Sequence, residues 1–277
     1  MTDVLPTSAG QSVEQQQADL RKAKEATAGP VPLIQDAVDT TFDLPRGLFR
    51  NTWHVRATVR ELTGADEEAM AKVREAVDFY ESVIALGTVR IGEIELAEMS
   101  LSERQGHLQQ LLIGERDMLF LGVTKATYGD RKTLKYRCQF EDCKEEQDLI
   151  LTLSEDFKPK EVEGLQATSF SFTTTKGQVL TYRPATGGDQ VEALRRKGAS
   201  MAEQNTIMLS RCIREVDGRV VVDPLGFARS LPMRDRQLLL DELMQHQPNI
   251  DLVVKIDCVA CRREQEVGLG WTDIFRL

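Results

Sequence analysis

The sequence predicts an α+β fold, in which helices pack beside small antiparallel sheets and two cysteine knuckles form a four-cysteine zinc ribbon. Two close cysteine pairs, Cys138–Cys143 and Cys258–Cys261, lie at the tips of hairpin patterns. Short segments that alternate apolar and polar residues predict the strands, and apolar residues that recur every three or four positions predict the helices. Because the two pairs are far apart in the sequence, a shared metal would join distant parts of the chain.

Residues 1–41 differ in composition from the rest. Residues 12–28 are rich in Gln, Glu, Lys and Ala and have almost no apolar stripe. We predict an N-terminal arm there, either disordered or ordered by a partner. The rest of the chain is long enough for a sizeable core. We predict a mainly helical region over 42–130 and a β-rich zinc-ribbon region with two inserted helices over 131–277.

The mainly helical region begins with alternating residues in Trp53–Arg60, which predict a half-buried strand. Leu62–Glu68 predicts a turn and a helix start, because its acidic residues favour the first turn of a helix. One amphipathic helix is predicted to follow, and a second over about 102–127. Arg116 and Asp117 lie in the second helix without a nucleophile or base nearby, so we interpret them as a salt-bridged helix surface. The apolar face of the first helix comprises Met70, Val73, Val77, Tyr80 and Ile84.

Turn dipeptides and helix signals divide the chain between the cysteine pairs. Lys176-Gly177 and Asp217-Gly218 each predict the turn of a hairpin. A further helix start follows Leu231-Pro232, and this helix is expected to stop before Pro248. The predicted elements are strands Ser169–Thr173 and Val179–Arg183, a helix over about 189–210, a hairpin over Ile213–Val222, and a helix from Leu231.

The four paired cysteines are the predicted metal ligands. Zinc prefers four soft or borderline donors at tetrahedral angles, and each tight turn supplies two thiolates. Four thiolates leave no position open for water or substrate, so the predicted Zn²⁺ is structural. Free buried thiols and disulfides are the alternatives. The predicted ligands are Cys138, Cys143, Cys258 and Cys261.

The two hairpins also resemble each other beyond the cysteines. Lys144-Glu145-Glu146-Gln147 follows the first pair, Arg262-Arg263-Glu264-Gln265 follows the second, and an apolar strand comes next in both. This faint internal repeat predicts a pseudo-symmetric ribbon. Cys212 stands alone and is expected to be a small core residue. The histidines, His54, His107 and His246, have no ligand spacing and are interpreted as ordinary surface or interface residues.

Charge and motifs limit the possible functions. The chain has 35 basic and 44 acidic residues, a net charge of -9, which disfavours a general nucleic-acid binder. It contains no apolar run of the roughly 20 residues that span a bilayer and no signal-peptide pattern, so a reducing cytosol is expected. No phosphate loop, nucleophile elbow or dinucleotide fingerprint is present. We therefore expect no enzymatic activity, no catalytic residues and no small-molecule substrate.

The order of several short motifs resembles the bacteriophage baseplate proteins of the T-even baseplate-hub type, found in contractile-tailed phages and prophages. The resemblance runs over about residues 42–277. The motifs that carry it are Leu44–Phe49, Val55-Arg56, Leu62–Glu68, Glu115–Leu119, Thr127–Gly129, the first cysteine pair with Asp148-Leu149, Val216–Gly218, Leu231–Asp235 and the final cysteine pair.

This resemblance implies a non-enzymatic part of the virion tail baseplate, assembled in the host cytoplasm with other baseplate, hub or tail proteins as partners and without a membrane. One alternative is a tail or baseplate assembly chaperone that is absent from mature particles. Another is a zinc-ribbon nucleic-acid-binding or regulatory protein, because basic residues cluster near the knuckles and such residues can contact phosphates. These residues are Lys132, Lys135, Arg137, Lys144, Arg262 and Arg263.

Overall fold

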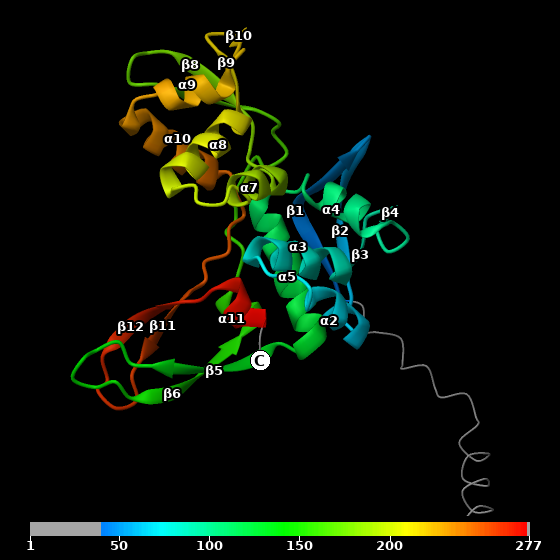
Figure 1. Ribbon diagram of the computed structural model, residues 1–277, viewed down its shortest axis with the longest axis vertical. Helices are drawn as coiled ribbons and strands as arrows, with labels where there is room; N and C mark the ends of the chain where they lie inside the picture. Colours follow the sequence, from blue (N-terminus) through cyan, green and yellow to red (C-terminus); the bar gives the residue numbers. More distant parts are fainter. Residues whose placement is uncertain (1–39, 276–277) are drawn as a thin grey trace, which may run out of the picture. The chain divides into compact units, whose positions relative to one another are not determined.

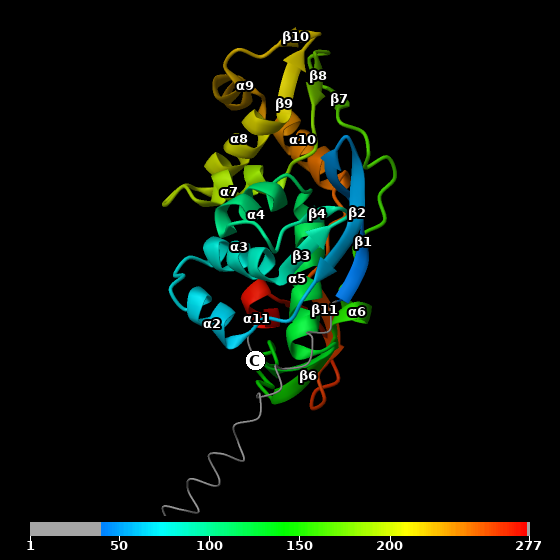
Figure 2. The same cartoon turned by 90° about the vertical axis from the view of Figure 1, so that its right-hand side faces the viewer.

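The structure is a computed structural model that describes residues 40–275. It confirms the α+β class: the described chain contains helices, two four-stranded antiparallel sheets and two two-stranded hairpins (Figures 1 and 2). The predicted N-terminal arm lies outside the described residues except for Thr40 and Thr41, which begin the first strand. The predicted domain boundaries at 41 and 130 stay a prediction.

The first sheet has the strand order β1-β2-β3-β4. Its strands are β1 (Thr40–Arg50), β2 (Thr52–Val59), β3 (Thr88–Ile91) and β4 (Ile94–Glu95). The strand predicted at Trp53–Arg60 is confirmed as β2, but β1 was not predicted, because Pro45 and Gly47 interrupt its pattern. A register shift between Asp43 and Leu48 accommodates both residues. Gly47 has a φ of 75°, which favours glycine, and a Cβ there would collide with the backbone of His54.

The helices of the first half are shorter than predicted. They are α2 (Gly64–Met70), α3 (Ala76–Gly87), α4 (Leu101–Leu108) and α5 (Ile113–Tyr128). The single helices predicted through Met70 to Ile84 and over 102–127 are therefore wrong, since each is two helices. Tertiary contacts explain the second break, because the carbonyls of Gln109 and Leu111 accept the backbone N–H groups of Gly188 and Gly187. No glycine or proline marks the first break in the sequence.

Arg116 and Asp117 are buried, not on a helix surface as predicted. Arg116 is fully buried and forms an ion pair with Glu81 of α3, and its guanidinium lies 5.2 Å from the Tyr80 ring centre. The Tyr80 hydroxyl donates a 2.6 Å hydrogen bond to Asp117. Burial raises the pKa of Asp117 to about 6. The prediction failed because α5 is enclosed by β1, β2, α3 and the α7 helix (Gly187–Leu194), which helix periodicity alone does not reveal.

The second sheet has the order β10-β9-β8-β7. Its strands are β7 (Phe170–Thr173), β8 (Val179–Tyr182), β9 (Ile213–Val216) and β10 (Arg219–Val220). They confirm both predicted hairpins. One face of the sheet packs on helices and buries Leu180, Tyr182 and Cys212, so the prediction that Cys212 is a core residue is confirmed.

The helices beside this sheet are α7, α8 (Met201–Cys212), α9 (Pro224–Ser230) and α10 (Met233–Gln245). The start predicted after Leu231-Pro232 is confirmed as α10. The helix predicted over 189–210 is wrong, because α7 and α8 are separate. Gly198 between them has a φ of 76°, and Ser200 caps the start of α8. Both features are typical of a helix end followed by a new helix start.

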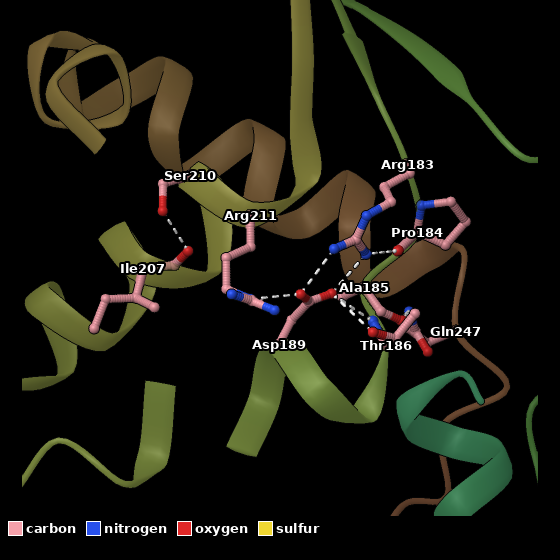
Figure 3. A network of polar contacts seen from close by, with 9 residues as sticks. All are labelled: Arg183, Pro184, Ala185, Thr186, Asp189, Ile207, Ser210, Arg211 and Gln247. Carbon is pink, nitrogen blue, oxygen red and sulfur yellow. Dashed lines mark hydrogen bonds and ion pairs between the residues drawn. The ribbon is translucent and has the colours of Figure 1, made fainter. Parts of the chain in front are cut away.

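The buried Asp189 in α7 is the centre of a polar network (Figure 3). Its side chain is fully buried and accepts hydrogen bonds of 2.6 and 2.8 Å from Arg183 and of 2.7 Å from Arg211 of α8. The backbone and hydroxyl of Thr186 donate to it as well. Burial alone would raise its pKa, but Arg183, Thr186 and Arg211 outweigh burial and lower the pKa to about 2. The network therefore ties α7, α8 and the end of β8 together.

We expect Asp189→Asn to lower the free energy of unfolding at neutral pH by about 2 kcal/mol, because two arginines lose a charged acceptor. Because the pKa of Asp189 is depressed in the folded state, ionised Asp189 stabilises the unmodified protein fully above about pH 4, and this stabilisation is lost as the pH falls towards 2. Urea unfolding of both proteins at pH 7 and pH 3 measures this. Asp235→Asn is the matched control, because Asp235 is equally buried but accepts from Thr175. A deficit that is independent of pH would contradict the expectation.

Candidate metal centre

The two cysteine pairs lie at the ends of two antiparallel hairpins, β5–β6 and β11–β12, as predicted. Their strands are β5 (Arg131–Arg137), β6 (Glu146–Thr152), β11 (Val253–Asp257) and β12 (Glu264–Gly268). Apolar residues of both hairpins, including Leu149, Leu151, Val254 and Val267, share one hydrophobic cluster with Leu121 of α5. Packing on this cluster therefore brings the two sequence-distant hairpins together, and Figure 1 shows them side by side.

The two knuckles repeat the same backbone design. The Cys138 N–H donates to the Glu145 carbonyl at 2.8 Å, and the Cys258 N–H donates to the Arg263 carbonyl at 3.1 Å. The residue after the second cysteine has a positive φ in both, 52° at Lys144 and 58° at Arg262. The repeat read from the sequence therefore extends to the backbone, although the first loop contains two more residues between its cysteines.

The four sulfur atoms form a compact group. All lie within 4.8 Å of one another, and two separations between the hairpins are 3.9 Å for Cys138–Cys261 and 3.7 Å for Cys143–Cys258. These separations far exceed a disulfide bond of about 2.05 Å. A tetrahedral zinc with bonds of about 2.3 Å requires sulfur atoms about 3.8 Å apart. The group thus has the dimensions of a four-thiolate metal site.

A glutamine from each hairpin contacts the knuckle of the other. Gln265 of β12 donates from Nε2 to the sulfur of Cys138 at 3.7 Å, and its Oε1 accepts from the Tyr136 hydroxyl at 2.5 Å. Gln147 of β6 accepts from the Val259 N–H at 2.9 Å. The two glutamines are the last residues of the two repeated tetrapeptides, and no functional role was predicted for them. They fix the hairpins to each other and orient a sulfur ligand.

Arg263 is a charged residue in direct contact with a cysteine sulfur. Its Nε donates to Cys261 at 3.4 Å, its NH2 pairs with Asp142 of the opposite knuckle at 2.5 Å, and its guanidinium lies 3.8 Å from the Phe140 ring centre. The hydrogen bond from Arg263 lowers the pKa of Cys261 to about 6. Arg263 therefore favours the thiolate form of Cys261, which is the form in which a cysteine binds a metal.

Within each knuckle, the two cysteines differ in solvent exposure. Cys138 and Cys258, the first cysteine of each pair, are almost fully buried, and Cys143 and Cys261 are half-buried. Because four thiolates in such a group repel one another, a divalent cation would stabilise their ionised form. A closed shell of four sulfur atoms has no place for a reacting water. The arrangement can hold a metal but offers no open coordination position.

The basic residues near the knuckles are mostly engaged within the ribbon. Lys135, Arg137, Lys144 and Arg263 pair with Asp148, Glu146, Glu141 and Asp142, at 2.5 to 2.6 Å. Lys132 is buried, where it donates to the Phe275 carbonyl at 3.1 Å. The cluster of basic residues seen in the sequence is thus largely neutralised by neighbouring acids.

Comparison with known families decides the identity of the chain. The family described as T4 bacteriophage base plate protein matches residues 91–276, a range that contains both knuckles and α5. The chain belongs to this family. It is therefore a phage baseplate protein, and membership implies contacts with other tail or baseplate proteins. The resemblance inferred from the order of motifs is confirmed.

Other comparisons add nothing to this assignment, since no curated protein and no solved structure matches the chain. Within residues 40–275, no helix of this baseplate protein is long and apolar enough to cross a membrane. In the same range, the four knuckle cysteines are the only group of histidine, cysteine and acidic side chains close enough to hold a metal, and no histidine belongs to it.

Proposed function

We propose that this baseplate protein is a structural subunit of the baseplate hub in a contractile tail, without enzymatic activity, and that zinc bound by the four cysteines makes it rigid. The observation that carries the proposal is the four-sulfur group at the junction of two sequence-distant hairpins, in a chain of the baseplate family. A bound metal would lock residues 131–152 to residues 253–268. A subunit that must transmit position within a large assembly benefits from such a fixed geometry.

Zinc is the metal that the donor set favours. Four thiolates select zinc or iron over the hard cations, which prefer oxygen. Native mass spectrometry of the purified chain, with elemental analysis, tests this proposal. We expect one zinc per chain, lost together with the folded ribbon on chelation. A folded chain purified without any metal, with four reactive thiols, would contradict it.

We expect Gln265→Leu to weaken metal binding roughly tenfold, because the residue that orients the Cys138 sulfur is lost. Competition with a chelator of known affinity measures the change. Gln237→Leu is the matched control, since Gln237 is exposed on α10 and donates only to Asp241. Equal metal affinity in both variants would show that Gln265 does not support the site.

The neutralised surface of the ribbon favours a protein partner over nucleic acid. Binding to a phosphate backbone needs free cations, whereas four of the basic residues near the knuckles already form ion pairs with acids. We therefore propose that its partners are other hub, baseplate or tail proteins. Binding to DNA that weakens steeply with added salt would instead support the regulatory alternative.

The decisive experiment is quantitative mass spectrometry of purified tails and of the infected-cell lysate. A structural subunit is present in tails at a fixed ratio to sheath and tube proteins, and this ratio gives its copy number. A protein abundant in the lysate but absent from tails would be an assembly chaperone, and the proposed structural role would then be wrong.

A further inference from the structure

The hairpin formed by β1 and β2 ends in an exposed aromatic tip. Phe49 is 61% exposed, and its ring packs edge-on against Trp53, with the ring centres 5.2 Å apart. Arg50 is exposed and is the only charged residue between Leu48 and Trp53. Within residues 40–275 its side chain has no hydrogen-bonding or ionic partner. Because aromatic and arginine side chains are the residues that most often anchor protein interfaces, the tip has the composition of such an anchor.

An open apolar groove of about 800 Å³ lies beside α2. Side chains of α2, α3, the end of α5 and the last helix, α11 (Trp271–Phe275), line it. Tyr128 is 37% exposed there and packs edge-on against Phe275, with the ring centres 5.3 Å apart. An accessible apolar surface of this kind is typical of a binding site. The apolar and aromatic residues that line the groove include Leu62, Met70, Val73, Phe79, Tyr128 and Phe275.

The groove carries one negative charge. Among the described residues, Glu67 is the only charged one that lines it. Glu67 is exposed, and within residues 40–275 its side chain has no hydrogen-bonding or ionic partner. Lys72 and Arg74 follow α2 and are exposed, but they do not line the groove. The apolar groove with its unpaired acid therefore complements the aromatic tip with its unpaired arginine.

The tip cannot reach the groove of its own chain. Thr40 at the start of β1 pairs with Val59, and α2 begins a few residues later at Gly64. From there β1 runs for 11 residues towards the tip, which places the tip roughly 30 Å away at about 3.3 Å per residue. Figures 1 and 2 show α2 and the tip at opposite ends of the first sheet. A tip can therefore fill this groove only on another copy of the chain.

We propose that the β1–β2 tip of one copy inserts into the α2 groove of a second copy, where Phe49 packs on the apolar residues and Arg50 pairs with Glu67. Successive side chains of a strand point to opposite faces, so Phe49 and Arg50 can contact two walls of one groove. Because tip and groove are different surfaces, the contact is heterologous, and its repetition builds a ring or a filament. The inference goes beyond the proposed function, since it does not depend on where in the tail the protein is located.

Sedimentation of the full chain over a concentration series tests for this contact. We expect species larger than a dimer to increase with concentration. Phe49→Ser removes the ring that fills the groove, and we expect it to weaken self-association at least tenfold. Met201→Ser is the matched control, because it removes a 70% exposed apolar side chain at the start of α8 that belongs to neither surface. Its self-association should equal that of the unmodified chain.

A mixture of two blocked variants tests whether tip and groove are the two partners. Ala71 lines the groove and is exposed, so Ala71→Arg narrows the groove and repels Arg50. Phe49→Ser and Ala71→Arg should each be largely monomeric alone. In an equimolar mixture, the intact tip of the Ala71→Arg chain meets the intact groove of the Phe49→Ser chain. We therefore expect dimers and nothing larger, because no second compatible contact remains.

Charge exchange tests the proposed ion pair. Arg50→Glu and Glu67→Arg each bring like charges together, so we expect either variant to associate roughly tenfold more weakly. The double variant Arg50→Glu, Glu67→Arg restores opposite charges between copies and should recover most of the association. Glu68→Arg is the matched control, since Glu68 is exposed on α2 but does not line the groove.

Three results would overturn the proposal. The unmodified chain could remain monomeric up to its solubility limit, which would assign the tip to a different protein. The mixture of Phe49→Ser and Ala71→Arg could stay monomeric although both variants unfold at the temperature of the unmodified chain, which would exclude insertion of the tip into this groove. The double charge variant could fail to recover association, which would exclude the pairing of Arg50 with Glu67.

Discussion

If the ribbon binds zinc as proposed, replacing Cys258 with serine is expected to unfold the ribbon and release the metal. Cys258 is fully buried, and its sulfur lies 3.7 Å from that of Cys143. Structural zinc contributes about 10–16 kcal/mol to the folding of small zinc-finger peptides, which is comparable with the entire stability of an ordinary domain. Because serine is a poor ligand for zinc, most of this contribution should be lost.

The damage should extend beyond the knuckle. The ribbon hairpins share a hydrophobic cluster with Leu121 of α5, and Trp271, Ile274 and Phe275 follow directly from β12. Loss of the metal therefore exposes apolar surface that is otherwise buried, and we expect insoluble or partly unfolded protein. Zinc content per chain, thermal unfolding and hydrogen exchange of residues 131–152 measure the effect.

Cys212→Ala is the matched control for this experiment. It also removes a buried thiol, but Cys212 lies in the core beside the second sheet and does not belong to the sulfur group. We expect this variant to keep its full zinc content and to lose only the modest stability of a small core truncation. A soluble, fully folded Cys258→Ser protein without metal would contradict this expectation, because hydrophobic packing alone would then be sufficient to stabilise the ribbon.

The parts of this fold that are fixed by local chemistry could be predicted from the sequence. Both cysteine knuckles and the hairpins around Lys176-Gly177 and Asp217-Gly218 form as expected, because turn residues determine them within a few positions. That the two cysteine pairs meet in one four-sulfur group could also be predicted, because each close pair supplies only two of the four ligands that a tetrahedral metal site needs.

The parts that depend on distant contacts could not be predicted. At the break before α5, Gly187 donates to the Leu111 carbonyl and Gly188 to the Gln109 carbonyl, and these distant partners could not be read from the local sequence. The roles of Gln147 and Gln265 depend on the opposite hairpin, although their equivalent places in the repeated tetrapeptides were a usable clue. For Arg116, charge suggested exposure, whereas the surrounding elements bury it completely.

Replacing Arg116 with alanine is expected to be among the most destabilising single changes outside the ribbon. The substitution leaves the buried Glu81 and Asp117 without their cation and creates a cavity beside Gly187, whose backbone packs against the arginine. Breaking a buried ion pair in this way costs about 3–5 kcal/mol. For a chain of this size, the melting temperature should fall by about 10 °C.

Two control variants separate the buried charge from other effects. Arg137→Ala removes an arginine whose ion pair with Glu146 is more than half exposed on both sides, so we expect a loss below about 1 kcal/mol. The double variant Arg116→Met, Glu81→Leu removes both charges of the buried pair and should recover much of the lost stability. If it were as unstable as Arg116→Ala, the packing of the arginine would matter more than its charge.

The pH dependence of the Arg116→Ala deficit provides a sharper test. Burial raises the pKa of Asp117 to about 6 although Arg116 opposes this rise, so removing Arg116 should raise this pKa further. A carboxyl with a raised folded-state pKa destabilises the fold as the pH increases, because its charge must then be buried, and this penalty disappears when it is protonated. The deficit of Arg116→Ala relative to the unmodified chain should therefore be smaller at pH 5 than at pH 8. A stability deficit that is the same at both pH values would show that the pKa of Asp117 does not depend on Arg116.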